Sequence, residues 1–273
     1  MPRAFVALLK LPFRHKLSEE SPRMKKNPFS TEAAEYVHLR PTYPDELFAF
    51  LATVVPSRAF AWDCATGNGQ AATHLAGYFG RVVATDESGE MIAQAPRDPR
   101  IIYRVAEAED SGLDDRSVDL VTVASAIHWF DLDKFYAEVR RVVKPGGTIA
   151  AWTYYTPVFD SEINAVIQRL IHEVLGPYWD ERLHYVVDEF HDLPFPFEQI
   201  EAPPFQTDMK WSMQDLLAYF ETWSSSVKYR EANHARPTAL IEDDLAQAWG
   251  DPQQKRDLYF PLYTRLGRVQ ART

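Results

Sequence analysis

The sequence predicts an α/β protein in which a mostly parallel sheet carries helices on both faces. Short apolar runs alternate with stretches of helical periodicity from about residue 45 to 152. One such run leads through Gly67-Asn68-Gly69 into a helix, and the next run ends in Asp86. Strand, glycine turn, helix, strand and acid together form half of a nucleotide-binding unit, in which the acid suits a ribose diol. We therefore expect a Rossmann-like sheet.

Composition sets the limits on class and partners. A chain of 273 residues suits one large α/β domain, or one domain with a sizeable insert. The formal net charge of −10 argues against nucleic acid, because phosphate backbones are bound by clustered Lys and Arg. Cys64 is the only cysteine, so no internal disulfide is possible and we expect no metal site. No apolar run approaches the ~20 residues that span a bilayer. We expect a cytoplasmic protein with no membrane partner.

The first 27 residues differ in character from the rest. Seven Lys and Arg side chains precede residue 27, against the two acids Glu19 and Glu20. We interpret residues 1–27 as a basic, disordered extension. An organelle transit peptide, or an upstream start with Met24 as the functional start, are the alternatives. Residues 28–273 form the predicted domain.

The predicted elements follow from periodicity and turn signals in order. Helices are expected at 45–55, 70–78, from Ser88, and at 132–143, the last capped by Asp131 or Asp133. Strands are expected at 59–62, 81–86, 101–105, 117–124 and 148–152. Further on, helices are predicted at 160–175, from near Ser212, and at 237–249, with extended chain at 198–211 and 257–266. The complete sheet would have seven strands, and a helical cap insert would occupy about 155–256.

A carboxylate precedes the two glycines, giving Asp63-x-Ala65-x-Gly67-x-Gly69. This resembles motif I of the class I S-adenosylmethionine-dependent methyltransferases, usually an acid followed by three alternating glycines. Ala65 replaces the first glycine, which a turn with negative φ at that residue would tolerate. An acid at Asp63 suits a ligand with ammonium and sulfonium groups better than a pyrophosphate, which it would repel.

Two later segments strengthen the resemblance. The string His128-Trp129-Phe130-Asp131 follows the strand at 117–124, at the edge where open α/β sheets bind ligands. The segment 138–147, ending in Lys-Pro-Gly-Gly, is similar to the family's junction between a helix and the fifth strand. Three motifs in the family's order and spacing predict methyl transfer from S-adenosylmethionine more strongly than any one of them.

The resemblance also implies a subgroup and a covering arm. The segment 29–44 and the string Thr222-Trp223-Ser224-Ser225-Ser226-Val227 are similar to methyltransferases of type 11 and of the trans-aconitate methyltransferase kind. In that group the segment that corresponds to residues 29–44, which we call the arm, covers the cofactor. Tyr36 and Arg40 lie four residues apart, on one face of a short helix. We therefore expect the arm to contact the cofactor or a substrate carboxylate. Aromatic packing with a surface arginine is the alternative.

The resemblance implies a set of site residues. Asp63 and the backbone at Gly67 and Gly69 would hold the methionine moiety, and Asp86 the ribose. The full predicted cofactor site is Asp63, Ala65, Gly67, Gly69, Gln70, Asp86, Met91, Glu107, Ala108, Glu109, Ser125 and Trp129. The predicted substrate contacts are Tyr36, Arg40, Tyr43, Trp179, Trp223 and Tyr229. His128 is the candidate catalytic base; fixing the loop is its alternative role.

The predicted function is methyl transfer to a small molecule, by in-line displacement onto a carboxylate or hydroxyl oxygen. A carboxylate needs no base at neutral pH, whereas a hydroxyl does. Two other classes stay open at this point. An NAD-dependent oxidoreductase shares the glycine pattern and Asp86 but leaves Asp63 unexplained. A non-catalytic cofactor-binding protein on the same fold would keep the sheet without turnover.

Overall fold

A computed structural model of the chain describes residues 40–270. The elements of the sheet region follow the predicted order. They are α2 (Asp45–Thr53), β1 (Phe60–Cys64), α3 (Gln70–Leu75), β2 (Arg81–Asp86), α4 (Gly89–Ile92), β3 (Ile101–Val105), β4 (Val118–Ala124), η1 (Ile127–Trp129), α5 (Leu132–Val142) and β5 (Val143–Thr153). Asp131 rather than Asp133 caps α5, since its side chain accepts from the backbone N–H of Lys134. The predicted arm residue Tyr36 and the extension 1–27 lie outside the described residues.

Five parallel strands form the core of the sheet. The order is β3-β2-β1-β4-β5-β8-β6, with β7 (Phe205–Trp211) paired to the outer half of β8 (Arg256–Arg268). β8 runs antiparallel to β5, and β6 (Glu198–Gln199) antiparallel to β8. The sheet therefore has eight strands where the sequence predicted seven, because the extended segment 198–211 supplies two separate strands. The mostly parallel Rossmann-like architecture is confirmed.

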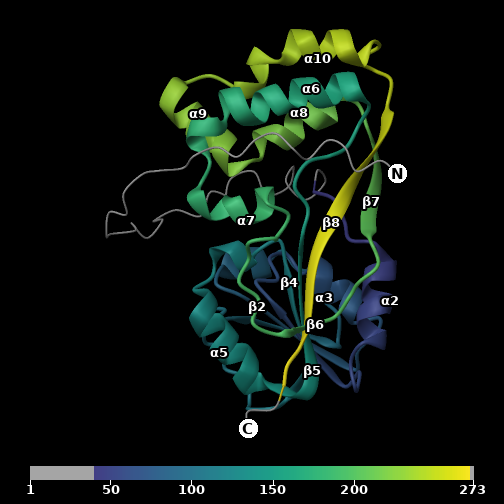
Figure 1. Cartoon of the computed structure of the whole chain (residues 1–273), viewed down its shortest axis with the longest axis vertical. Coiled ribbons are helices and arrows are strands. Elements are labelled where there is room, and N and C mark those ends of the chain that lie inside the picture. Colours follow the sequence, from purple (N-terminus) through teal and green to yellow (C-terminus); the bar gives the residue numbers. More distant parts are fainter. Residues whose placement is uncertain (1–39, 271–273) are drawn as a thin grey trace.

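Two apolar layers hold helices against the sheet. On one face α5 packs through Phe135, Val139 and Val142 onto Trp62 and neighbouring sheet residues. The other face is covered by α2 and α3, whose inward side chains cluster around Trp152 (Figure 1). Parallel strands covered on both faces read as nearly continuous apolar runs, as in β4. Helices on both faces are thus confirmed.

The remaining helices gather at the carboxyl end of the strands. They are α6 (Ser161–Arg169), a π-helical turn η2 (Leu170–Val174), η3 (Gly176–Tyr178), η4 (Glu181–Leu183), α7 (His184–Val187), α8 (Met213–Glu221), α9 (Ser224–Asn233), η5 (Pro237–Leu240) and α10 (Glu242–Trp249). Figure 1 shows α6, α8, α9 and α10 stacked above the sheet, with β8 running from this layer down into the sheet. We call the helices from α6 to α10 the cap.

The cap has an apolar core of its own. Ile163, Ile167 and Leu170 pack in one cluster with apolar residues of α8 and α10, and Trp249 is fully buried there. Phe260 of β8 belongs to the same cluster, so the β7–β8 ribbon ties the cap to the sheet. None of the helices within residues 40–270 is long and apolar enough to cross a membrane.

Three predicted helices differ in detail. The helix expected at 70–78 ends at Leu75, and the helix expected at 237–249 is a 3₁₀ turn followed by α10. The helix expected at 160–175 widens from α6 into the π-helical turn Leu170–Val174. The side-chain periodicity that predicts a helix is nearly the same for these variants, so the sequence pattern does not separate them.

Candidate active site

The turn between β1 and α3 places open backbone at the end of the central strand. The Thr66 N–H donates to Thr85 O at 2.8 Å, and the Gly69 N–H donates to Thr66 O at 2.9 Å. These bonds fix left-handed backbone at Gly67 (φ 57°) and Gly69 (φ 84°). The same loop also holds Ala65 at φ 53°. The expectation of a negative φ at Ala65 is wrong: the alanine is in a left-handed conformation, which glycine adopts without strain.

Ala65→Gly should therefore stabilise the protein. An L-residue in left-handed backbone costs about 1–2 kcal/mol, and the greater freedom of glycine in the unfolded chain offsets part of the gain. We expect the free energy of unfolding to rise by about 1 kcal/mol, measured by urea denaturation. Ala93→Gly is the matched control, because Ala93 is exposed at φ −63° and the same change should be destabilising there. Equal effects at both positions would contradict the strain at Ala65.

Each glycine of the turn faces a specific side chain. A Cβ added at Gly69 would lie 2.5 Å from the Tyr103 hydroxyl oxygen, so Tyr103 on β3 closes the underside of the turn. A Cβ at Gly67 would lie 3.5 Å from the Met91 methyl group, which places half-buried Met91 over the glycine loop. Gln70, at the first turn of α3, is also half-buried. The open face at Gly67 is thus bordered by Met91.

Asp63 lies deeper than the motif suggests. Asp63 is fully buried, with 0% of its surface exposed. Thr66 Oγ1 donates to its Oδ2 at 2.5 Å and Thr122 Oγ1 to its Oδ1 at 2.7 Å. Burial, the largest effect, raises the pKa of Asp63 to about 6, although the two hydroxyls and the Ala72 N–H favour the ionised form. Asp63 therefore holds the turn to α3 and to the neighbouring strand β4.

Asp86 links the glycine turn to the loop after β2. Its carboxylate accepts the Gly67 N–H on Oδ2 and the Ser88 N–H on Oδ1, both at 2.8 Å. Each carboxylate oxygen has a second lone pair, and Asp86 is only half-buried. The side chain can thus accept two further hydrogen bonds from a ligand beside Gly67.

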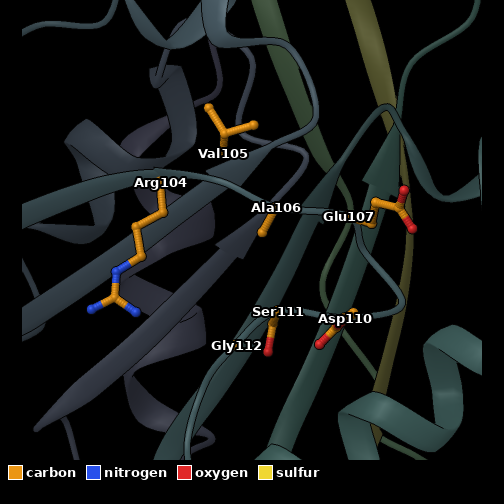
Figure 2. A pocket seen from close by; sticks show the side chains of 7 residues that line it. All are labelled: Arg104, Val105, Ala106, Glu107, Asp110, Ser111 and Gly112. Atoms are coloured by element: carbon orange, nitrogen blue, oxygen red, sulfur yellow. The ribbon is translucent and has the colours of Figure 1, made fainter.

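A pocket of about 530 Å³ lies where β3 ends. Figure 2 shows Arg104 and Glu107 at opposite ends of its lining, with Asp110 and Ser111 on the following loop. Of the three residues predicted to border the adenine, exposed Glu107 lines this pocket, whereas Ala108 is 9% exposed and packs inward. The third, Glu109, accepts the Asp131 N–H at 2.8 Å, and so it joins this loop to the start of α5.

The end of β4 carries a second strained residue and the predicted base. Ser125 has φ 54°, and its hydroxyl lies 3.4 Å from the Tyr43 hydroxyl. His128 is 6% exposed, and its Nδ1 has no hydrogen-bond partner within the described chain. Burial lowers the pKa of His128 to about 4, and the nearby Arg182 guanidinium contributes to this shift. The imidazole is therefore neutral at pH 7 and a weak base.

The cap touches this edge of the sheet at two places. The Arg182 guanidinium, from η4, lies 4.6 Å from the Trp129 ring centroid and is held by Asp180. The Arg40 guanidinium lies 5.5 Å from the centroid of Tyr219 on α8. Trp129 itself is half-buried. The segment before α2 and the η4 turn thus each join the sheet edge to the cap.

A continuous row of aromatic rings connects the sheet edge to the cap. Neighbouring ring centroids lie between 5.3 and 6.5 Å apart. In contact order, this aromatic row consists of Tyr43, Tyr154, Phe260, Tyr219, Trp223, Trp179 and Tyr155.

Three predicted substrate residues serve the cap's own packing. Trp223 is 6% exposed within the cap core. The Trp179 indole N–H donates to Ile171 O at 3.0 Å, and Tyr229 packs edge-on against Tyr178. Tyr43 and Arg40, in contrast, lie at the junction between sheet and cap.

Sequence reasoning missed several residues of the site. Thr66 and Thr122 surround Asp63, Tyr103 closes the turn at Gly69, and Arg182 covers Trp129. Thr66 stands inside the motif and so carried a local signal. The others come from distant segments, and only the strand register and the fold of the cap bring them here. No cluster of His, Cys, Asp and Glu able to hold a metal occurs in residues 40–270.

The fold and the residues at the carboxyl ends of its strands are typical of α/β proteins that bind nucleotide-like ligands at this edge of the sheet. The methyltransferase domain family model matches residues 62–151. A Dictyostelium discoideum protein named as a methyltransferase is 30% identical over 250 residues, which cover 89% of this chain and 95% of the relative. A Mycobacterium tuberculosis protein, also named as a methyltransferase, is 35% identical over 232 residues, which cover 81% of this chain and 89% of the relative.

A solved structure is also similar. A protein of Anaeromyxobacter dehalogenans, described as a type II methyltransferase, superposes with a TM-score of 0.79 at 44% identity, covering 85% of this chain and 99% of that one. The chain belongs to the class I S-adenosylmethionine-dependent methyltransferases, and the alternative of an NAD-dependent oxidoreductase is set aside. The narrower likeness to trans-aconitate methyltransferases stays a prediction.

Proposed function

We propose that the enzyme binds S-adenosylmethionine along the carboxyl ends of β1 to β4 and methylates an oxygen of a small carboxylic acid. Asp86 would accept the two ribose hydroxyls on its remaining lone pairs. The open backbone at Gly67 and Gly69 would face the methionine moiety, with Met91 beside it. The fit is supported by the partly exposed left-handed backbone at Gly67, which carries no side chain of its own, and by the half-buried carboxylate of Asp86 beside it.

The chemical demands on the protein are modest. The bound cofactor supplies a methyl group that is already strongly electrophilic. The chain's residues must align the acceptor oxygen with the methyl–sulfur bond and exclude water. The cap supports this role, because its η4 turn covers Trp129 and its helix α8 lies against Arg40.

The observation that carries a small-molecule acceptor is the end of the aromatic row at the junction between sheet and cap, where Tyr43 and half-buried Tyr154 lie. The rings further along the row, such as Trp223, pack within the cap core. Rings at the junction suit the apolar body of a small compound. Arg40 lies at this row, against Tyr219, and its planar guanidinium suits a carboxylate. The acceptor would thus have an apolar part and an acidic part.

The titratable groups at this edge favour an acceptor that is already ionised. The pKa of His128 is lowered to about 4, so the imidazole is poorly matched to removing a hydroxyl proton. Burial raises the pKa of the Tyr155 phenol well above its usual range, so it stays protonated. A carboxylate acceptor needs no base, which is consistent with a weakly basic His128 and a protonated Tyr155. Loop fixation is then the better role for His128.

The direct test is turnover with matched acceptors. A panel would pair octanoate, cinnamate and trans-aconitate with the primary amides and alcohols of the same skeletons. We expect methyl esters by mass spectrometry and formation of S-adenosylhomocysteine for acids, with kcat independent of pH between about 6 and 9. Methylation of alcohols or amines alone, rising with pH, would contradict the carboxylate assignment.

Arg40→Gln provides a second test. Loss of the guanidinium should raise the KM for an acid substrate by about tenfold or more, while the Kd of S-adenosylmethionine stays within about twofold. Arg58→Gln is the matched control, since Arg58 is exposed beside the opposite end of β1. An unchanged KM in Arg40→Gln would remove Arg40 from the acceptor site.

A further inference from the structure

Asp63 is a fully buried carboxylate with only neutral hydrogen-bond donors. Thr66 and Thr122 supply hydroxyls, and Ala72 supplies a backbone N–H. The other fully buried aspartate of the sheet, Asp119, is different, because Lys144 Nζ lies 2.7 Å from its Oδ1. Within residues 40–270, no basic side chain forms an ion pair with Asp63. Burying an uncompensated charge is unfavourable.

The ionisable groups around Asp63 do not supply the missing positive charge. Cys64, its neighbour on β1, and Tyr103, on β3, are neutral with raised pKa values. Asp86, on β2, is acidic and disfavours the charge on Asp63. The basic residue of α3, His74, instead stacks on Phe48 with ring centroids 4.6 Å apart. Within the described chain, the glycine turn therefore presents two acids and no cation of its own.

We propose that Asp63 senses the charge on the cofactor's sulfur, so that S-adenosylmethionine binds with Asp63 ionised while S-adenosylhomocysteine also tolerates the protonated acid. The proposal rests on the proposed cofactor site. Both ligands carry an α-ammonium and an α-carboxylate, whose charges offset each other, so they differ only by one methyl group and one positive charge on sulfur. During transfer a bond forms between the methyl carbon and the acceptor while the methyl–sulfur bond breaks. The electron pair of the broken bond stays on sulfur, and the sulfonium becomes a neutral thioether. The acid then loses its counter-charge and can take up a proton from solvent. S-adenosylhomocysteine would then gain no stabilisation from the charge on Asp63, which favours release of this product.

The proposal predicts a proton linkage with a definite sign. Near and below pH 6 the free protein carries a proton on Asp63 in part or in full, and binding of the sulfonium must release it. The affinity for S-adenosylmethionine should then fall up to about tenfold per unit of pH below 6. The affinity for S-adenosylhomocysteine should change much less. Above about pH 7 the ratio of the two affinities should become constant.

Calorimetric titration of the full chain at about pH 5.5, in two buffers of different ionisation enthalpy, measures the protons released. We expect about half a proton or more for S-adenosylmethionine and much less for S-adenosylhomocysteine. Asp63→Asn should abolish the difference, whereas Glu87→Gln, an exposed neighbour of Asp86, should retain it. Equal release with both ligands, or release that persists in Asp63→Asn, would overturn the proposal. Absence of binding by either ligand would instead contradict the cofactor site itself.

A second variant guards against misfolding of Asp63→Asn. Thr122→Val removes one hydroxyl from the carboxylate, which should raise the pKa of Asp63 further and move the proton release to higher pH. An unshifted release in a folded Thr122→Val protein would also count against Asp63. These measurements follow binding alone, so they are independent of the identity of the methyl acceptor.

Discussion

Asp86→Ala should weaken binding of S-adenosylmethionine and S-adenosylhomocysteine about 100-fold or more. The substitution removes the carboxylate proposed to accept both ribose hydroxyls, and hydrogen bonds to a charged group contribute about 1.5–3 kcal/mol each. It also deprives the Gly67 and Ser88 N–H groups of their acceptor. Because both ligands carry the ribose, their affinities should fall together, as measured by calorimetry.

The controls separate binding from folding. Glu87→Ala changes the exposed neighbour of Asp86 and should leave both affinities unchanged. Circular dichroism of Asp86→Ala should show an intact fold, because Asp86 lies half-buried at the end of β2. A folded Asp86→Ala protein that binds both ligands with wild-type affinity would remove Asp86 from the cofactor site.

Gly69→Ala should destabilise the protein by about 2–4 kcal/mol. A Cβ at Gly69 would lie 2.5 Å from the Tyr103 hydroxyl oxygen and 3.1 Å from two of its ring carbons. The backbone is also left-handed there, at φ 84°. Overpacking costs about 1–3 kcal/mol and the conformation about 1–2 kcal/mol, a large share of a typical stability of about 5–15 kcal/mol. Urea denaturation measures the loss.

Gly112→Ala is the matched control for this effect. Gly112 has φ 64°, but nothing in the described chain lies within 4 Å of an added Cβ. It should therefore lose only the conformational part, about 1–2 kcal/mol. Adding Tyr103→Phe to Gly69→Ala should recover part of the loss, since the nearest atom is removed. Equal destabilisation by the two alanines would show that Tyr103 does not restrict position 69.

Much of the sheet was predictable because its signals are local. The apolar runs, the glycine turn and Asp86 lie in one short segment, and their order alone predicts a nucleotide-binding sheet. The conformation of Ala65 was not predictable, because the next residue, Thr66, donates its N–H to Thr85 O on β2, a partner that lies outside the motif. A sequence motif gives the residue type at each position but not the backbone angle of that residue.

The surroundings of Asp63 and the cap show a second limit. The partner Thr122 is 59 residues away, and only the pairing of β1 with β4 brings it opposite Asp63. In the cap, aromatic residues at helical spacing predict burial but not which cavity or core they fill. Trp223 was therefore predicted as a substrate contact, although the structure buries it within the cap.

Calorimetric titration of the unmodified chain with S-adenosylmethionine, S-adenosylhomocysteine and NAD tests the proposed cofactor site. We expect saturable binding of the two sulfur ligands at about pH 7.5, where Asp63 is ionised, and no binding of NAD. A ligand present at ~100 times its Kd should also raise the stability by about 2.7 kcal/mol. Absence of binding by both sulfur ligands, or binding of NAD alone, would contradict the cofactor site described for Asp63, Gly67 and Asp86.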